Sequence, residues 1–161
     1  MQMVYHEQFD QLEKLINGLR GEKQEFYQGT PQLSEIYGDL SSFSDDTDDA
    51  QWKLYITKLE SWAEAYPQSP APLVALGNVY VDWAWKARGT GYANTVTAGG
   101  WTEMRERLDM ARQNLETAEQ LPVKDPELYE SLLNVALGQG WSKDKMNEVF
   151  QKGIALEPND L

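Results

Sequence analysis

The sequence contains no cysteine and a single histidine, His6. Without cysteine, disulfides, thiolate metal sites and cysteine nucleophiles are all excluded. One histidine near the N-terminus cannot supply a site that needs two His ligands, or a His relay elsewhere in the chain. We expect His6 to be an exposed polar side chain near the chain end. We predict no metal site and no cofactor.

Basic residues are also scarce, since 14 Lys and Arg stand against 26 Asp and Glu, for a formal net charge of −12. Nucleic acids and anionic membranes both attract positive charge, so the composition argues against either as a partner. No apolar run approaches the roughly 18 residues of a membrane-spanning helix, and no signal-peptide core follows Met1. We therefore expect a soluble, cytoplasmic protein, with a secreted or periplasmic location as the alternative if the N-terminus was cut.

Apolar residues, by contrast, make up 41% of the 161 residues, which is enough for the core of one domain. They recur at helical spacing along nearly the whole chain, and no stretch alternates as a half-buried strand does. Residues 70–87 are apolar nearly all round, which is typical of the buried centre of a helical domain. The pattern predicts an all-α protein of about seven helices, at 9–19, 31–40, 48–66, 70–87, 98–118, 126–138 and 143–157.

The clearest break in the helical pattern is the segment 41–49, which carries closely spaced carboxylates. Ser, Thr and Asp side chains favour turns and helix starts, so we expect an N-cap near Asp46 or Thr47. The acids would then lie favourably at the positive end of the next helix. A calcium loop is the alternative, although the segment lacks the Gly turn and the distal Glu of an EF-hand.

Two segments resemble the helices of tetratricopeptide (TPR) repeats, which pair antiparallel helices through small residues. Residues 76–80 (LGNVY) are similar to the signature of the first helix, and residues 111–118 match the spacing of the second. Gly77 and Ala111 are 34 positions apart, so both helices are lengthened around a Gly-rich connection at 88–100. The resemblance implies helix pairs stacked as a right-handed superhelix in a single domain over 1–161, with N-terminal helices in 1–44 and a TPR-like core at 48–158.

Two further strings resemble an uncharacterised bacterial family of TPR-like proteins, recorded as a domain of unknown function. They are residues 83–97 (WAWKARGTGYANTVT) and residues 135–141 (VALGQGW). The resemblance implies a helical repeat fold and no established activity, cofactor or catalytic residue. Members of the family continue with aromatic-rich helices past the position of Pro158, whereas this chain stops at Leu161. We therefore expect a shortened chain, from which any site completed by later helices is missing.

Loops on a rigid helical scaffold commonly carry binding residues, which makes the Gly-rich connection the first candidate site. Arg88 could grip a carboxylate through both arms of its guanidinium, and Tyr92, Asn94 and Thr95 could add orienting hydrogen bonds. The structural alternative is that Arg88 interacts with the carbonyl end of its own helix, while Gly89 and the glycine after Thr90 form turns.

Six tryptophans in one small domain could line an aromatic groove for a peptide, although Trp at helical spacing is more often part of the core. The exceptions are Trp85, which lies off the main apolar stripe, and Trp141, which lies in a Gly-flanked loop. Asp82 is the remaining candidate, because a desolvated carboxylate could act as a general acid or base. We expect it instead to pair with Lys86 or Arg88.

These features favour an interaction module with no intrinsic catalysis, because stacked helix pairs form concave recognition surfaces. The acidic charge predicts a basic peptide or protein as its partner. The alternative is a carboxylate-based hydrolase or small-ligand-binding protein with a pocket near Asp82, Arg88 and Tyr92. A third hypothesis is a homodimer formed through the C-terminal helix, which lacks an evident capping helix.

Overall fold

A computed structural model describes residues 1–21 and 32–156, and this part of the chain is helical throughout, without strands. The predicted all-α class is therefore confirmed, and the helices end within about two residues of their expected limits. No helix of the described part has the length and apolar character that a membrane span requires. The elements are α1 (Gln2–Tyr5), α2 (Phe9–Gly21), α3 (Gln32–Ser41), α4 (Asp49–Ala65), α5 (Ala71–Arg88), the 3-10 helix η1 (Ala93–Thr95), α6 (Ala98–Gln120), α7 (Glu127–Gln139) and α8 (Lys143–Leu156).

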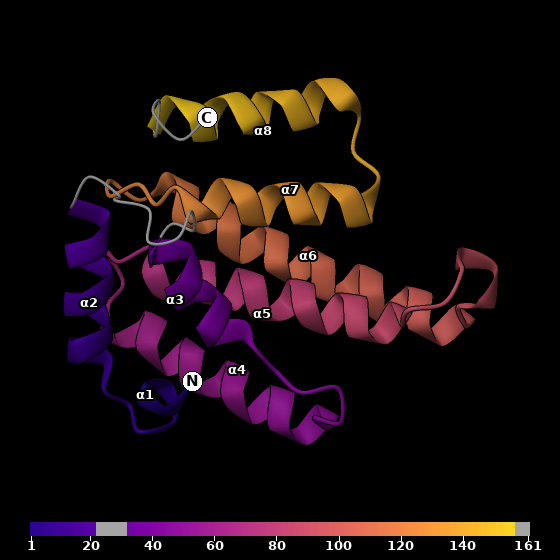
Figure 1. Cartoon of the computed structure of the whole chain (residues 1–161), viewed down its shortest axis with the longest axis horizontal. Helices are drawn as coiled ribbons and strands as arrows, with labels where there is room; N and C mark the ends of the chain where they lie inside the picture. Colours follow the sequence, from indigo (N-terminus) through magenta and orange to yellow (C-terminus); the bar gives the residue numbers. More distant parts are fainter. Residues whose placement is uncertain (22–31, 157–161) are drawn as a thin grey trace.

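Helix α5 is the centre of the molecule, as its apolar surface predicted. It packs against α3, α4, α6 and α7, and its most extensive contact is with α6 (Figure 1). Helix α8 packs on α7 at one end of the stack, while α2 stands across the other helices at the side opposite the Gly-rich connection (Figure 1). Helix α1 was not predicted from the apolar pattern; it buries Val4 against α4, and His6 after it is exposed as expected.

Local signals explain where several helices start and end. Thr97 caps α6 as predicted, because its hydroxyl accepts a hydrogen bond of 3.0 Å from the Gly100 N–H. Helix α4 starts slightly later than expected: its N-cap is Asp48, which forms a capping box with Gln51. Helix α7 ends at Gly140, whose φ of 65° is the left-handed conformation that glycine adopts without strain.

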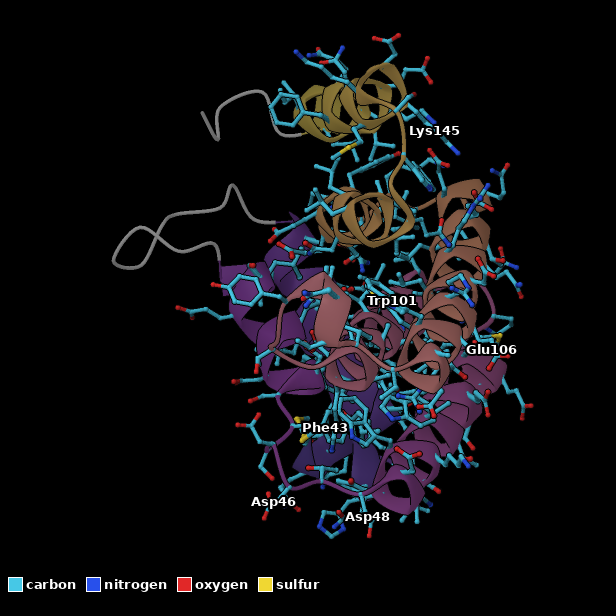
Figure 2. All side chains as sticks on the ribbon, turned by 90° about the vertical axis from the view of Figure 1, so that its right-hand side faces the viewer. Phe43, Asp46, Asp48, Trp101, Glu106 and Lys145 are labelled. Carbon is cyan, nitrogen blue, oxygen red and sulfur yellow. The ribbon has the colours of Figure 1, made fainter. Side chains whose placement is uncertain are left out.

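The acidic segment between α3 and α4 forms a solvated loop. Asp46 and Asp48 lie at its outer edge, whereas Phe43 points into the molecule (Figure 2). Asp46 accepts a hydrogen bond from Ser44, and Asp49 accepts one of 3.1 Å from the Trp83 indole. Across the described ranges, no three His, Asp or Glu side chains converge as ligands for a metal ion. Asp46, Asp48 and Asp49 are therefore occupied in capping and surface hydrogen bonds.

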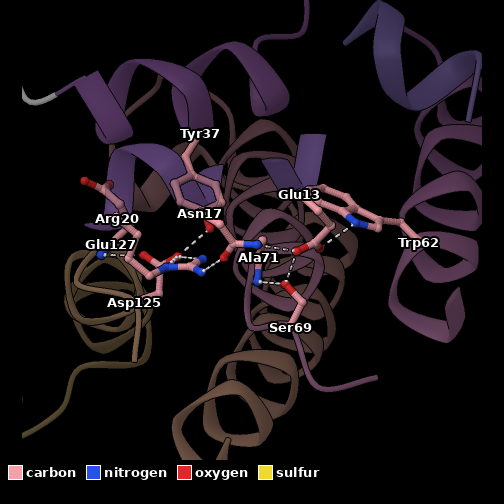
Figure 3. Close-up of polar contacts among 9 residues, drawn as sticks. All are labelled: Glu13, Asn17, Arg20, Tyr37, Trp62, Ser69, Ala71, Asp125 and Glu127. Carbon is pink, nitrogen blue, oxygen red and sulfur yellow. Dashed lines mark hydrogen bonds and ion pairs between the residues drawn. The ribbon is translucent and has the colours of Figure 1, made fainter. Parts of the chain in front are cut away.

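Helices α2, α3 and α7 meet at a buried polar cluster that joins residues far apart in the sequence (Figure 3). Asp125, just before α7, accepts hydrogen bonds of 2.6 Å from Arg20 Nη2 and 2.6 Å from the Tyr37 hydroxyl. Burial, and the negative charge of Asp125 beside it, raise the pKa of Tyr37 well above its ordinary value. The cluster fixes α3 against the start of α7 and was not visible in the sequence.

A second buried carboxylate continues this network along the same face of α2. Glu13 accepts hydrogen bonds of 2.9 Å from the Trp62 indole N–H and 2.9 Å from the Ser69 hydroxyl (Figure 3). Asn17 connects the two clusters, because it donates to Glu13 at 3.3 Å and accepts from Arg20 at 2.7 Å. Buried carboxylates need such partners, so this part of the network fixes α2 against α4 and against the turn before α5.

The close contact between α5 and α6 depends on Gly77, the glycine of the TPR-like segment. A Cβ at this position would lie 2.6 Å from Leu115 Cγ. We therefore expect Gly77→Ala to lower the free energy of unfolding by about 1–3 kcal/mol, because the methyl group would push the two helices apart. Urea unfolding followed by tryptophan fluorescence measures this change.

The matched control for this prediction is Gly18→Ala, in the exposed part of α2. No atom lies within 4 Å of a Cβ built at Gly18. This substitution should raise the free energy of unfolding by about 0.5–1 kcal/mol, because alanine loses less backbone entropy in a helix. If both alanine variants gained stability, the close contact between α5 and α6 would be contradicted.

Candidate functional site

The larger of two pockets on the outer face of α5 is rich in aromatic side chains. We name it the aromatic pocket; it has a volume of about 510 Å³ and lies between the loop after α3 and the C-terminal end of α5. Its aromatic walls come from Phe43, Trp52 and Trp85. The remaining lining residues are Ser41, Ser42, Ser44, Asp45, Asp82, Lys86, Gly89 and Thr90.

The smaller pocket continues along α5 between α3 and α7. We name it the polar pocket; it has a volume of about 160 Å³. Ser41 and Asp82 line both pockets, so the two adjoin each other at these side chains. The polar pocket is lined by Ser34, Tyr37, Gly38, Ser41, Asn78, Val81, Asp82, Glu127, Glu130, Ser131 and Asn134.

The aromatic wall is held in place by stacking between three elements. Phe43 lies on Trp52 with ring centroids 3.8 Å apart, and Trp52 is stacked against Trp83 with centroids 5.9 Å apart. The Trp83 indole donates to Asp49 at the start of α4, which fixes its orientation. The loop after α3 is therefore attached to α4 and α5 through its single phenylalanine.

The charged side chains that line the two pockets are mostly acidic. The carboxylates are Asp45, Asp82, Glu127 and Glu130, and Lys86 is the one cation among the described lining residues. Desolvation raises the pKa of Asp82 above its ordinary value of 3.8, and a hydrogen bond from Ser41 partly offsets this shift. Such a carboxylate favours the approach of a positive charge.

The expected ion pair of Asp82 with Lys86 or Arg88 is wrong. None of the ion pairs between described residues includes Asp82. Lys86 donates instead to the backbone carbonyl of Thr47 and lies over the ring of Trp52. The loop between α3 and α4 therefore draws Lys86 away from the neighbour that its helical spacing favours.

Arg88 contacts two tryptophan rings and the backbone carbonyls of the connection. Its guanidinium lies 5.7 Å from the ring centroid of Trp85 and 5.8 Å from that of Trp101. Its Nη1 donates to the carbonyls of Gly89 and Gly91, at 3.1 and 3.2 Å. Arg88 thus ties the start of the connection to the end of α5, but its acceptors are carbonyls of the connection, whereas the structural alternative expected the last carbonyls of the helix.

The other candidates of the connection lie away from the two pockets. Tyr92 is 85% exposed, and its carbonyl accepts hydrogen bonds from the amide and the hydroxyl of Thr95. Asn94 lies between them in η1 and is exposed. Gly89 has the positive φ expected of a turn glycine, whereas Gly91 does not. Of the predicted binding residues, only Trp85 lines a described pocket, and Asp82, the acid-base candidate, lines two.

Trp141 lies in the turn between α7 and α8 and packs beside the middle of α6. Its ring is covered by the side chains of Arg112 and Lys145, at 5.1 and 3.6 Å from the centroid, and its indole donates to Gln139. Arg112 is 14 residues beyond the start of α6, about 21 Å along the helix from the Gly-rich connection. Trp85 and Trp141 therefore belong to separate surfaces.

Several residues of the pockets were missed by sequence reasoning, notably Ser41, Phe43 and Asp45. The signal available was the single aromatic residue within a polar loop, which indicates an anchor to the core. Its position over the end of α5 depends on helix packing rather than on local sequence.

Compared with protein families, with curated proteins and with solved structures, the chain matches none of them, so its resemblance to TPR-like proteins stays a prediction from the sequence.

Proposed function

We propose that this chain is an interaction module of the TPR-like type that binds a basic peptide segment of a partner protein across the aromatic and polar pockets. The observation that carries the proposal is the acidic lining of two adjoining pockets on one helix. The net charge of −12 extends the same preference to the whole surface and would raise the association rate of a basic partner.

The polar pocket has side chains that suit an extended peptide backbone. The Ser131 hydroxyl bonds to the Asn78 side-chain oxygen, which leaves the Asn78 amide nitrogen as a donor toward a ligand. Asn134 is exposed in the same pocket and offers both a donor and an acceptor. Neutral amides can bind the backbone of any peptide, whereas the carboxylates beside them favour peptides with positively charged side chains.

The packing of the helices supports a repeated helix-pair arrangement. Helix α5 packs between α3 and α7, so the three helices form a row. The helices that alternate with them along the chain pack on this row: α4 and α6 contact α5, and α8 contacts α7. Both pockets draw most of their lining from this α3–α5–α7 row and the loop after α3, and the aromatic pocket adds Trp52 of α4 and two residues of the connection, Gly89 and Thr90. In repeat proteins the row of equivalent helices forms a continuous recognition surface.

The hydrolase alternative receives less support. It requires a pocket near Asp82, Arg88 and Tyr92, and the last two do not line the pockets that Asp82 lines. A general acid or base also needs a second group placed at the reacting atoms. Homodimer formation through α8 and the cytoplasmic location stay predictions.

Peptide binding can be tested by fluorescence anisotropy with a labelled peptide of alternating Arg and Ser residues. The matched control is the same peptide with Glu in place of Arg. We expect only the Arg peptide to bind, and its affinity to fall at least about tenfold between 0.1 and 1 M NaCl, because the Debye length shortens from about 10 to 3 Å. Equal binding of the Glu peptide, or binding independent of salt, would refute the electrostatic basis of the proposal.

A further inference from the structure

Lys86 occupies part of the aromatic pocket with a positive charge from the chain itself. Its Nζ lies 5.9 Å from the centroid of the Trp52 ring and donates to the Thr47 carbonyl. Asp82, one helical turn earlier, is the residue with which helical spacing would pair it. Among the described residues, the pocket thus holds a cation near its aromatic wall and a carboxylate without a paired cation.

Asp82 is an acidic group of this pocket that a ligand can reach. Its side chain is exposed, and its carboxylate accepts a hydrogen bond from Ser41. Trp52, by contrast, is 2% exposed and packs against Phe43 and Trp83. A ligand cation would therefore meet the carboxylate of Asp82, with the 39% exposed ring of Trp85 as the accessible aromatic surface.

We propose that the aromatic pocket holds an arginine side chain of the bound peptide, beside Asp82 and against the exposed ring of Trp85, and that Lys86, the cation of the pocket itself, competes with it for this position. Arginine suits this position better than lysine, because its planar guanidinium both stacks on an indole ring and donates two parallel hydrogen bonds to a carboxylate. This inference rests on the proposed peptide binding and adds the anchor residue and an internal competitor.

Small probes test the pocket apart from the rest of the peptide. N-acetyl-arginine amide and its neutral isostere N-acetyl-citrulline amide are titrated into the full chain while NMR follows the indole N–H signals. The variant Trp85→Phe identifies the signal of interest. We expect the arginine probe to shift this signal and the citrulline probe to leave it in place, because only arginine carries the charge.

The competitor is tested with Lys86→Met, which keeps the aliphatic stem and removes the charge. We expect the arginine probe to bind this variant about 2–5-fold more tightly than the parent, because the variant removes a like charge from the same pocket. Lys14→Met removes an exposed lysine of α2, which stands at the side opposite the Gly-rich connection (Figure 1), and changes the net charge equally. This control should alter the affinity by less than about 1.5-fold, since screening weakens the effect of a distant charge. Urea unfolding midpoints show that each variant is folded.

The outcomes separate this inference from the proposed function. Equal shifts by the two probes, or binding by Lys86→Met that is unchanged or weaker, overturn the arginine pocket. If the Arg/Ser peptide still binds the parent in that case, the proposed function stands without this anchor. If neither the peptide nor the arginine probe binds the parent or Lys86→Met, both the inference and the proposed function are refuted.

Discussion

Replacing Asp125 by alanine is expected to lower the free energy of unfolding by about 3–5 kcal/mol, the usual cost of breaking a buried ion pair. The Asp125 side chain has no exposed surface, and that of Arg20 is 10% exposed. The substitution would leave the Arg20 guanidinium buried without its carboxylate and the Tyr37 hydroxyl without its 2.6 Å acceptor. Urea unfolding followed by circular dichroism measures the loss.

Two further variants show whether buried charge is the cause. Lys152→Ala breaks the surface pair between Lys152 and Glu119, whose atoms are 2.7 Å apart, and should cost at most about 1 kcal/mol. The triple variant Arg20→Met, Tyr37→Phe and Asp125→Leu removes the whole polar cluster. It should recover most of the stability, because no buried charge is left without its partner. A loss below about 1 kcal/mol for Asp125→Ala would contradict a stabilising role of the cluster.

This cluster also bears on the candidate site. Tyr37 donates to Asp125 and lines the polar pocket, so the same side chain takes part in both. Breaking the cluster removes the contact that fixes α3 against the start of α7. We therefore expect Asp125→Ala to weaken peptide binding as well as folding, because the polar pocket lies between these two helices.

The sequence predicted the helices well because their limits are set locally. Thr97 caps α6, Asp48 caps α4 and Gly140 ends α7, each through residues within a few positions of the helix end. The apolar face of each helix was equally local, since it follows from spacing alone. Helix α1 escaped prediction because a single turn is too short to show a period.

The polar clusters could not be predicted because their members are distant in the chain. Arg20 and Asp125 are 105 positions apart, and Glu13 and Trp62 are 49 positions apart. Each residue alone resembled an ordinary charged or core side chain. Which faces of two helices meet is decided by the packing of the whole domain, and spacing within one helix contains no information on it.

Only part of the candidate site could be predicted, because its walls come from segments that are distant in the chain. Trp85 and Asp82 were recognised because they lie on a helix that is otherwise buried, and both line the aromatic pocket. The opposite wall comes from the loop after α3, which the sequence identified only as a break. Arg88 and Tyr92 were singled out for their chemistry, yet Arg88, at the last position of α5, and Tyr92, in the connection, do not line these pockets.

Reversing the charge of Asp82 should have the largest effect on binding, because this residue belongs to both pockets. We expect Asp82→Lys to weaken the binding of the Arg/Ser peptide by about 10–100-fold, that is by about 1.4–2.7 kcal/mol. Asp82→Asn removes the charge without reversing it and should give an intermediate loss. Fluorescence anisotropy at low salt measures all three affinities.

A control with the same change in net charge separates local recognition from long-range attraction. Glu64→Lys reverses an exposed charge on α4, 12 residues beyond Trp52 and so about 18 Å along the helix from the aromatic pocket. It should weaken binding by less than about threefold, because screening limits the reach of an exposed charge. Equal losses for the two reversals would show that the net charge of the protein, and not the pocket, selects the peptide.

Stability distinguishes a binding role of Asp82 from a structural one. Its pKa is raised by desolvation, so in the folded protein the ionised carboxylate is less favourable than in the unfolded chain. Stability is therefore lost as the pH rises from below 3.8 through the folded pKa, and it is not regained at neutral pH. Asp82→Asn keeps a hydrogen-bond acceptor for Ser41 and removes this penalty, so its free energy of unfolding at pH 7 should equal or exceed that of the parent. A variant that is at least as stable and yet binds the peptide more weakly assigns Asp82 to recognition, whereas a less stable one assigns it to the fold.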